Sequence, residues 1–489
     1  MDAEAGVKQF IQKCCFLSHG VLKYGVRRVF GQTRRAGKGG KEMSIPKLSE
    51  EKYREVVAAY EKKTPKSKKL IEESRKYIVP MGAPAYMIWH RPYPLFIDSA
   101  KGSRLYDVDG NEYIDMFIDQ GISYIGHKAP AIRKAIDKAL DKYGLHLEMC
   151  EELAIKWAQK VMQHYPSIKK IKIVNSGNEA TELVCQIARA FTGKTKIIKF
   201  AGHHHGWNGV LSYDALAAGS GTLFTLGIPN NHWDNLINLP PNDIGIVEKA
   251  LQDNKDQVAA VVLEPLGASS GGTPLNEGFQ KQLRDLTTKY NVLLAFDEVA
   301  TGFRVALGGA QQVLGITPDL TCLGKPVGGG IPIGAVGGRE DVMSVVGALD
   351  PKAEHFGPLF PMGSFCAHPL AMAAGIAFIE ELEKGDYISN SIARAADLAK
   401  VINEVAASAK MDVSAHSIYS IVHFGLNGKF DMSQVMEVFE FDLMIRLALL
   451  LGNPGVVILP GHVYMSGVMT EKDIQKSRAA FETAFSIYQ

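Results

Sequence analysis

Short, unbroken apolar runs alternate with amphipathic stretches through the middle of this chain. The clearest runs are residues 171–174, 196–200, 258–263 and 292–296, and helical patterns such as 179–191 and 277–290 lie beside them. A strand with one solvent-exposed face would alternate apolar and polar residues, so continuous apolar runs suit strands that are covered on both faces. The sequence therefore predicts an α/β fold, in which a mainly parallel sheet is sandwiched by helices over about 130–375.

The length of 489 residues exceeds the usual size of a single domain, so a second, smaller lobe is expected. We predict a large domain over 121–375 and a smaller α+β domain over 376–489, which the segment 43–120 joins. Within that segment, Asp109-Gly110 stands between two alternating runs and predicts a β-hairpin.

Residues 1–42 differ in composition from the rest, with nine Lys or Arg against three acids. We predict a basic, disordered and dispensable extension. The alternative is a weak amphipathic helix that binds a membrane surface or a partner.

Overall charge and cysteine usage exclude several classes of protein. Lys and Arg number 54 against 52 Asp and Glu, so the net charge of the chain does not favour binding to nucleic acid. The six cysteines form no CxxC pair, which favours reduced thiols and a cytoplasmic location. No run approaches the roughly 18 apolar residues that span a bilayer, so we predict no membrane span.

Two residues at strand ends point to a specific cofactor chemistry. Asp297 closes the strand 292–296, and Lys325 follows an apolar strand at 320–323, ahead of Pro326 and a glycine-rich loop. An aldehyde cofactor with a pyridine ring needs a lysine amine to form a Schiff base and an acid against the ring nitrogen. The pair indicates pyridoxal phosphate. The alternatives are a solvated lysine, and an Asp297 that caps a helix or pairs with Arg304.

The turn between the strand 171–174 and its helix is a candidate phosphate cradle. Ser176, Gly177 and Asn178 are small residues at a helix N-terminus, where exposed N–H groups and the helix dipole favour an anion. The alternative is an ordinary turn that Ser176 or Asn178 caps.

Two other strand ends carry polar residues. Three adjacent histidines follow the strand 196–200, and successive side chains diverge, so we predict no metal site there. His204 is expected to stack on a flat cofactor, with a polar loop histidine as the alternative. Glu264 ends the strand 258–263, where it is catalytic or pairs with a cation.

Together these motifs resemble the class III pyridoxal-phosphate enzymes, nearest to the branch that contains glutamate-1-semialdehyde aminomutase. The string from Asp297 to Arg304, with Lys325 placed 28 positions after Asp297, is highly specific, and the Asn-Ser-Gly-x-Glu-Ala string from Asn175 to Ala180 adds to it.

The resemblance implies a fold-type-I homodimer with active sites shared between subunits. It implies that Lys325 forms the Schiff base and shuttles protons, that Asp297 is the pyridinium partner and that Val299 packs under the ring. The remaining implied cofactor-binding residues are Ser176, Gly177, Asn178, His204, Glu264 and, toward the phosphate of the other subunit, Ser364.

Substrate recognition departs from the aminomutase pattern. The segment 83–86 lacks the arginine of the family's Ser-Pro-x-Arg, and the region 459–470 lacks the glutamate of the family's Phe-Glu pair and the histidine of its Ser-x-x-His-Thr run. A small-molecule amino substrate is expected, and candidates for binding its carboxylate are Tyr86, His90, Arg91, Arg446 and Tyr464. We therefore expect an aminotransferase, with an aminomutase, racemase or ammonia-lyase of the same family as the alternative.

Overall fold

The predicted sheet is present in the computed structural model, which describes residues 48–79, 91–213, 228–267, 272–347, 359–426, 446–459 and 461–487. Its seven strands are, in spatial order, β4 (Lys170–Val174), β11 (Gly334–Gly338), β10 (Leu320–Gly324), β9 (Leu293–Asp297), β7 (Val258–Leu263), β5 (Lys196–Phe200) and β6 (Leu236–Leu239). The five strands from β10 to β6 are parallel, whereas β11 is antiparallel to both of its neighbours. The prediction of a mainly parallel sheet is confirmed.

Strand β11 has no counterpart in the predicted elements. Its sequence is Gly-Ala-Val-Gly-Gly, and glycine is depleted in strands, so no apolar run marks it. The glycines are needed for close packing. A Cβ at Gly337 would lie 2.6 Å from Ile168 Cγ2, and one at Gly334 would overlap the Ser176 carbonyl.

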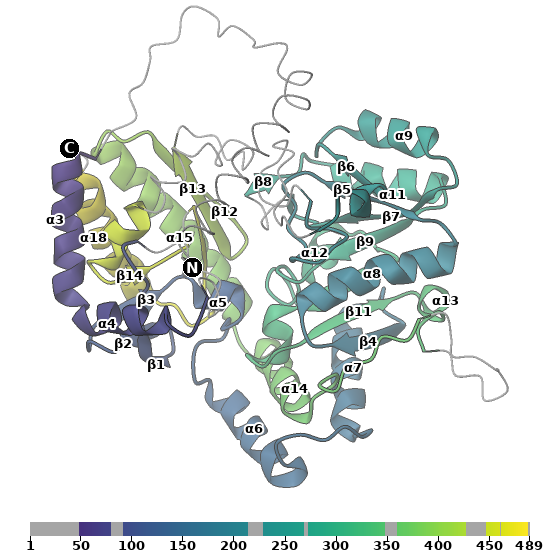
Figure 1. Cartoon of the computed structure of the whole chain (residues 1–489), viewed down its shortest axis with the longest axis horizontal. Helices are drawn as coiled ribbons and strands as arrows, with labels where there is room; N and C mark the ends of the chain where they lie inside the picture. The colour runs from purple at the N-terminus through teal and green to yellow at the C-terminus, as the bar shows by residue number, and fades with distance from the viewer. Residues whose placement is uncertain are drawn as a thin grey trace, which may run out of the picture. The chain divides into compact units, whose positions relative to one another are not determined.

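Helices cover both faces of the sheet (Figure 1). Alternate residues of β7 point to opposite sides, with Ala260 and Val262 in the core cluster under α8 (Gly177–Thr192). Val261 and Leu263 belong to the other cluster, under α9 (Ile244–Asp253) and α11 (Phe279–Lys289). Because both clusters are buried, the continuous apolar runs have the two-sided burial that the sequence predicts.

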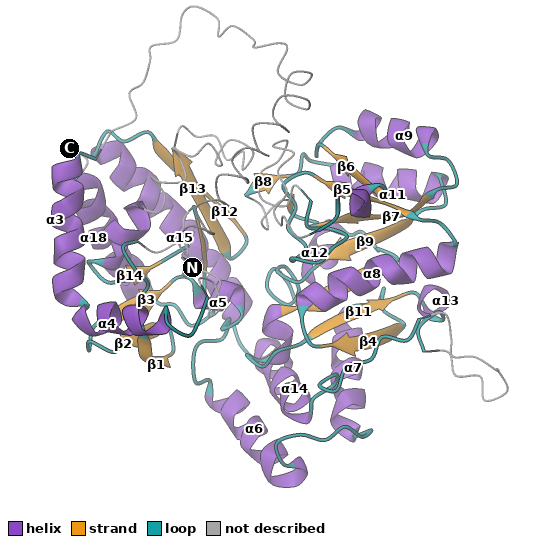
Figure 2. Ribbon diagram, viewed as in Figure 1, coloured by secondary structure: helices purple, strands orange, loops and turns teal. Residues whose placement is uncertain are grey.

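Figure 2 shows how helices and loops connect these strands. The further elements between residues 118 and 384 are α5 (Ile118–Gly121), α6 (Pro130–Tyr143), α7 (Glu152–His164), η2 (Asn230–Trp233), β8 (Thr273–Pro274), α12 (Gly309–Leu314), η3 (Lys325–Gly328), α13 (Glu340–Met343) and α14 (Pro369–Lys384). Helix α14 packs against α6, α7 and η3.

The first described segment forms helices α3 (Glu50–Lys63) and α4 (Pro65–Ser74), followed by β1 (Ile97–Lys101), β2 (Arg104–Asp107) and β3 (Glu112–Asp115). The β2–β3 hairpin is confirmed, and Gly110 in its turn has φ of 90°, which suits glycine. Strand β14 (Val456–Val457) pairs with β3, so residues from both ends of the described chain share one sheet.

The C-terminal part combines α15 (Tyr387–Ser408) and α18 (Glu471–Ser486) with a sheet of β12 (Val413–Ile418), β13 (Ile421–Leu426) and β15 (His462–Tyr464). One face of this sheet packs against α15, and Phe424 meets Phe481 of α18 edge to face at 6.1 Å between ring centroids. The domain boundaries given above remain predictions. The predicted boundary at residue 375 lies inside helix α14.

Residues 46–489 form one compact unit, and the predicted extension 1–42 lies outside the described residues. No helix in the described ranges is both long enough and apolar enough to cross a membrane.

Candidate active site

Loops at the carboxyl ends of β4, β9 and β10 meet around the side chain of Val299. A Cβ at Gly177 would lie 2.8 Å from Val299 Cγ1, and a Cβ at Gly324 would lie 3.2 Å from the same atom. The valine therefore packs against both the turn at the start of α8 and the residue before Lys325, and these two also lie against each other. Glycine at 177 permits so close an approach, and a side chain at 324 would be tight against the same valine.

The turn before α8 is capped, and it is also the N-terminus of that helix. The Ser176 hydroxyl accepts from the Glu179 N–H at 3.2 Å, and the Asn178 carboxamide oxygen accepts from the Trp207 N–H at 2.8 Å. The capped turn expected as the alternative is thus present. A cap leaves other first-turn N–H groups without acceptors inside the helix, at the positive end of a dipole. The same turn is therefore suited to an anion.

Asp297 pairs with His205 rather than with Arg304. One carboxylate oxygen lies 2.7 Å from His205 Nδ1, and the other accepts from the Val299 N–H at 3.0 Å. The Arg304 guanidinium instead donates to the carbonyls of Ala300 and Gly121. The alternative of an Asp297–Arg304 ion pair is wrong, because the turn from Ala300 to Arg304 directs the guanidinium toward α5.

The three adjacent histidines diverge, as the sequence predicts. His203 is buried and its Nδ1 accepts from the Glu264 N–H at 3.0 Å, while His205 contacts Asp297. The Glu264 carboxylate accepts from the backbone N–H of His204 at 2.8 Å and so holds the loop in place. Among the residues with described positions, no group of three or more His, Cys, Asp or Glu is arranged to hold a metal ion.

His204 is exposed to solvent, although protein atoms surround it on most sides. Removal from bulk water, followed by the positive charge of Lys325, lowers the pKa of His204 to about 4. The ring is therefore neutral at pH 7 and offers a flat face. Its stacking on a cofactor stays a prediction.

Lys325 stands at the first position of η3 in an unusual backbone conformation. Its φ of 49° lies in the left-handed region, which non-glycine residues seldom adopt and which is frequent at functional sites. The buried Trp157 donates from Nε1 to the Val327 carbonyl at 3.1 Å and so anchors the turn. The amine lies 6.0 Å from the ring centroid of Tyr464, the one substrate-binding candidate that the structure places here.

The other candidates lie elsewhere. Arg446 packs on Tyr53, with 4.3 Å between the guanidinium carbon and the ring centroid, and reaches Glu50 of α3 at 3.4 Å. Arg91 is exposed, and Tyr86, His90 and the segment 83–86 lie outside the described residues.

The sequence did not single out His462 or Gly121 as site residues. His462 meets the Tyr464 ring edge to face at 5.4 Å, and a Cβ at Gly121 would lie 2.6 Å from Arg304 Nη2. No motif signalled these contacts, because strand and loop packing join segments that are far apart in the chain.

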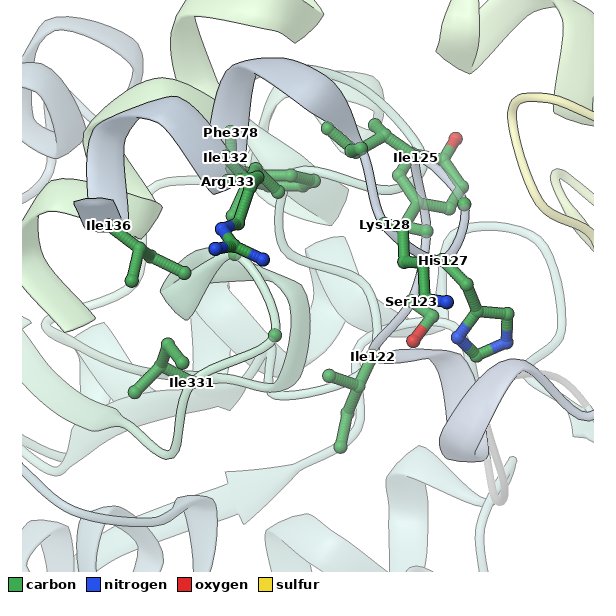
Figure 3. A pocket seen from close by; sticks show the side chains of 15 residues that line it. Ile122, Ser123, Ile125, His127, Lys128, Ile132, Arg133, Ile136, Ile331 and Phe378 are labelled. Atoms are coloured by element: carbon green, nitrogen blue, oxygen red, sulfur yellow. The ribbon is translucent and has the colours of Figure 1, made fainter. Parts of the chain in front are cut away.

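Two cavities flank this site. The first, of about 250 Å³, is lined by Ile132 and Arg133 of α6, His127, Phe378 and Ile331 (Figure 3). None of Lys325, Asp297 and His205 lines it, so it is separate from the chemistry.

The second cavity, of about 670 Å³, borders the turn at the start of α8. Asn178, Trp207, Met362 and Cys366 are among its lining residues. Ser364, in the same loop as Met362 and Cys366, is exposed.

The family model for aminotransferase class III matches residues 85–465, which is more than half of the chain. The chain belongs to the class III aminotransferase family. A glutamate-1-semialdehyde 2,1-aminomutase of Natranaerobius thermophilus is 36% identical over 403 residues, which cover 80% of this chain and 91% of that protein.

Solved structures give the same assignment. An omega-transaminase from Sphaerobacter thermophilus superposes with a TM-score of 0.79 at 30% identity, covering 86% of this chain and 97% of that one. A transaminase with PLP bound gives a TM-score of 0.78 at 27% identity, covering 87% of this chain and 98% of that one. The protein is a fold-type-I, pyridoxal-phosphate-dependent enzyme.

The described residues fit the cofactor of class III enzymes. Asp297 is 5% exposed, and His205 holds its carboxylate in place, so a buried acid is available to a ring nitrogen. The Nε2 of His205 has no partner among the described residues. Gly177 leaves no room for a side chain at the start of α8, where N–H groups suit a phosphate. Lys325 would supply the amine.

Proposed function

We propose that this class III enzyme is an aminotransferase that acts on a small amino substrate. The observation that carries the proposal is the convergence of the α8 N-terminus, Val299 and the Gly324-Lys325 turn, beside an Asp297 that His205 holds. Bound pyridoxal phosphate supplies a carbonyl for the amine and an electron sink for the substrate carbon.

The chain's own groups divide the work around that chemistry. Lys325 would hold the cofactor, and its amine would serve as the base that takes a proton from the substrate carbon and returns it. Asp297 would stabilise positive charge on the ring nitrogen, and the N-terminus of α8 would hold the phosphate with Ser176, Gly177 and Asn178. Val299 and His204 would flank the cofactor ring, and Glu264 fixes the loop that carries His204.

Amino migration within one substrate is the second candidate. The 36% identity to a protein named glutamate-1-semialdehyde 2,1-aminomutase favours it. The missing arginine at 83–86 and the altered region 459–470 favour a different substrate. Racemisation and elimination of ammonia use the same proton transfers and remain further alternatives.

One experiment separates these candidates. The purified, cofactor-loaded protein is mixed with a panel of amino donors, first without and then with an acceptor keto acid. An aminotransferase converts its cofactor to pyridoxamine phosphate once and then needs the acceptor, and Lys325→Ala abolishes the conversion while the surface control Lys170→Ala does not. Continued product formation without an acceptor would favour a mutase, racemase or lyase, and no conversion with any donor would contradict amino transfer.

We also propose that the enzyme is a homodimer whose subunits share their active sites. Large apolar side chains are exposed next to Ser364: Leu145, Met149, Trp207, Met362 and Phe365 are 61–75% exposed. His146 packs on Phe365 at 5.0 Å between ring centroids, and Trp207 and Met362 line one cavity, so the loop around Ser364 carries part of an apolar surface that includes Trp207. A second copy that covers this surface would bring its own cofactor phosphate to Ser364.

The dimer is tested by placing charge on that surface. Phe365→Glu is expected to give a monomer in light scattering and to weaken cofactor retention. The control Leu70→Glu changes a similarly apolar exposed side chain on α4 and is expected to change neither. A monomeric wild-type protein would contradict the proposal.

A further inference from the structure

The ring of Tyr464 contacts two cations in the site. The Lys325 amine lies over this ring, 6.0 Å from its centroid, and the guanidinium carbon of Arg304 lies 5.3 Å from the same centroid. The electrons on the face of an aromatic ring attract a cation that lies within about 6 Å of the centroid. The ring is therefore placed to attract the lysine amine while that amine is charged.

The backbone and the neighbouring rings fix Tyr464 in this position. Tyr464 is 5% exposed, and it pairs with Ile421 in the register of β15 and β13. Its N–H donates to the Met116 carbonyl at 3.0 Å, and the His462 ring meets it edge to face at 5.4 Å between centroids. A side chain whose rotamer is locked by packing can orient a flexible neighbour.

Arg304 supports the ring from the interior of the protein. It is fully buried, its Nε donates to the Ala300 carbonyl at 2.9 Å, and its Nη2 donates to the Gly121 carbonyl. Its guanidinium carbon also lies 4.6 Å from the ring centroid of Tyr124. Among the described residues no carboxylate pairs with Arg304, so two carbonyls and two phenol rings surround this cation.

The turn of α5 packs against both the guanidinium and the ring. All four of its residues have φ between 38° and 93°, a region that non-glycine residues seldom adopt and that is frequent at functional sites. A Cβ at Gly121 would lie 2.6 Å from Arg304 Nη2 and 3.3 Å from Tyr464 Cδ1. The absence of a side chain at Gly121 lets the guanidinium and the ring lie together.

The ring and the hydroxyl of Tyr464 can be tested as separate groups. The sequence makes Tyr464 a candidate for binding a substrate carboxylate, which is work for the hydroxyl. The contact with Lys325 is made by the ring. Phenylalanine keeps the ring and removes the hydroxyl, whereas leucine removes both.

We propose that Tyr464 is a positioning residue for Lys325, and that its ring face holds the charged lysine amine beside the cofactor whenever the amine is free. This assignment rests on the proposed function, in which Lys325 holds the cofactor and returns a proton. Arg304 and the α5 turn keep the ring in place. Tyr464 acts through Lys325, so it is not itself a catalytic residue.

The first test measures the amine without turnover. Lys325 of the full-length, cofactor-free protein is labelled by reductive methylation, and mass spectrometry follows the labelled peptide from about pH 7 to about pH 11. Loss of the ring face makes the charged amine less stable. The midpoint of the pH profile is therefore expected to lie about half a unit lower in Tyr464→Leu than in Tyr464→Phe.

The neighbouring histidines do not disturb this measurement. The pKa values of His204 and His462 are lowered to about 4, chiefly by burial, so both rings are already neutral in this pH range. Tyr464→Phe is the reference because it has no hydroxyl that could lose a proton. Equal midpoints for the leucine and phenylalanine variants would overturn the role of the ring.

Two further variants guard against an indirect effect. Tyr464→Met fills the same space with a flexible side chain that has no ring, and it should behave as Tyr464→Leu does. Tyr290→Leu is the matched control, because the Lys289 amine lies over the Tyr290 ring at 5.1 Å from the centroid. This control should leave the Lys325 profile unchanged.

The second test is kinetic. With a donor that the loaded enzyme accepts, the saturating rate of cofactor conversion is expected to fall about twofold to fivefold from Tyr464→Phe to Tyr464→Leu. The donor concentration that gives half of this rate should change less than twofold. A raised donor concentration with an unchanged rate would mean that the ring binds substrate instead, and would overturn the positioning role.

The proposed function can fail separately. Labelling needs no amino donor, so a shifted profile supports the positioning role even if no donor converts the cofactor and amino transfer is wrong. Equal profiles for Tyr464→Leu and Tyr464→Phe, with normal conversion in the wild type, would overturn the role of Tyr464 and leave amino transfer standing.

Discussion

The Asp297 carboxylate lies 2.7 Å from Nδ1 of His205, and both side chains are almost fully buried. Asp297 ends β9 and His205 follows β5, two strands away in the sheet. The imidazole fixes the orientation of an acid whose other oxygen already accepts the Val299 N–H. An acid held at both oxygens is presented to the cofactor ring without further rearrangement.

Replacing His205 is expected to act through Asp297. In His205→Phe the carboxylate loses a buried hydrogen bond, which costs about 1–3 kcal/mol. We expect the cofactor conversion to slow by roughly tenfold to a hundredfold, in proportion to that loss. The measurement is a double-mutant cycle with Asp297→Asn. Additive effects of the two substitutions would show that His205 does not act by orienting Asp297.

A methyl group at Gly177 is expected to push the α8 N-terminus away from Val299. The Cβ of Gly177→Ala would lie 2.8 Å from Val299 Cγ1, and overpacking of this kind typically costs about 1–3 kcal/mol. Cofactor affinity, measured by equilibrium dialysis, should fall roughly tenfold, since each 1.4 kcal/mol is a factor of about ten.

The substitution Val299→Ala in the same chain should restore much of that affinity, because it removes the clashing methyl groups. Gly452→Ala is the matched control, since its Cβ would meet no atom within 4 Å. Failure of the second substitution to rescue would mean that the clash is not the cause.

The cofactor-free protein is expected to lose stability as the pH falls from 6.5 toward 4. His462 has its pKa lowered from 6.5 to about 4, first by burial and then by Lys325. Between these values the unfolded chain binds a proton that the folded chain does not, so the free energy of unfolding falls with pH. His204 contributes in the same direction.

This pH dependence is checked by thermal unfolding at pH 7 and at pH 4.5. The drop in Tm should be smaller in His462→Phe than in the wild type, because that variant has no proton to take up at this position. An equal drop in both proteins would refute the assignment.

Glu298 is expected to be essential for the loop that follows Asp297. Its fully buried carboxylate accepts from the Thr301 hydroxyl at 2.9 Å and from the amides of Ala310 and Gln311 at 2.5 and 3.2 Å. Glu298→Ala leaves these donors unsatisfied and should lower the free energy of unfolding by about 3 kcal/mol or more. Urea unfolding measures the change.

The control for that prediction is Glu340→Ala, because the Glu340 side chain is 71% exposed. A surface change of this kind should stay within about 0.5 kcal/mol of the wild type. A similarly small effect for Glu298→Ala would show that the loop does not depend on the buried carboxylate.

Local sequence patterns predicted the parallel strands to within a residue or so, because two-sided burial demands unbroken apolar runs. β5 and β7 match their predicted bounds, and β9 begins one residue later than expected. β11 could not be predicted in this way, because its glycines are required by close packing against Ile168 and Ser176. That packing exists only after the sheet has formed.

The sequence by itself determined the strands and the cofactor, and it predicts Lys325 as the lysine that holds the cofactor, because each depends on residues that are neighbours in the chain or lie at strand ends. Only the tertiary structure decided that Asp297 pairs with His205, that Arg304 turns toward Gly121, and that the Tyr464 ring contacts both Arg304 and Lys325. The reason is physical. These contacts join residues on different strands and loops, and their partners are set by strand register and by loop packing, which no local pattern encodes.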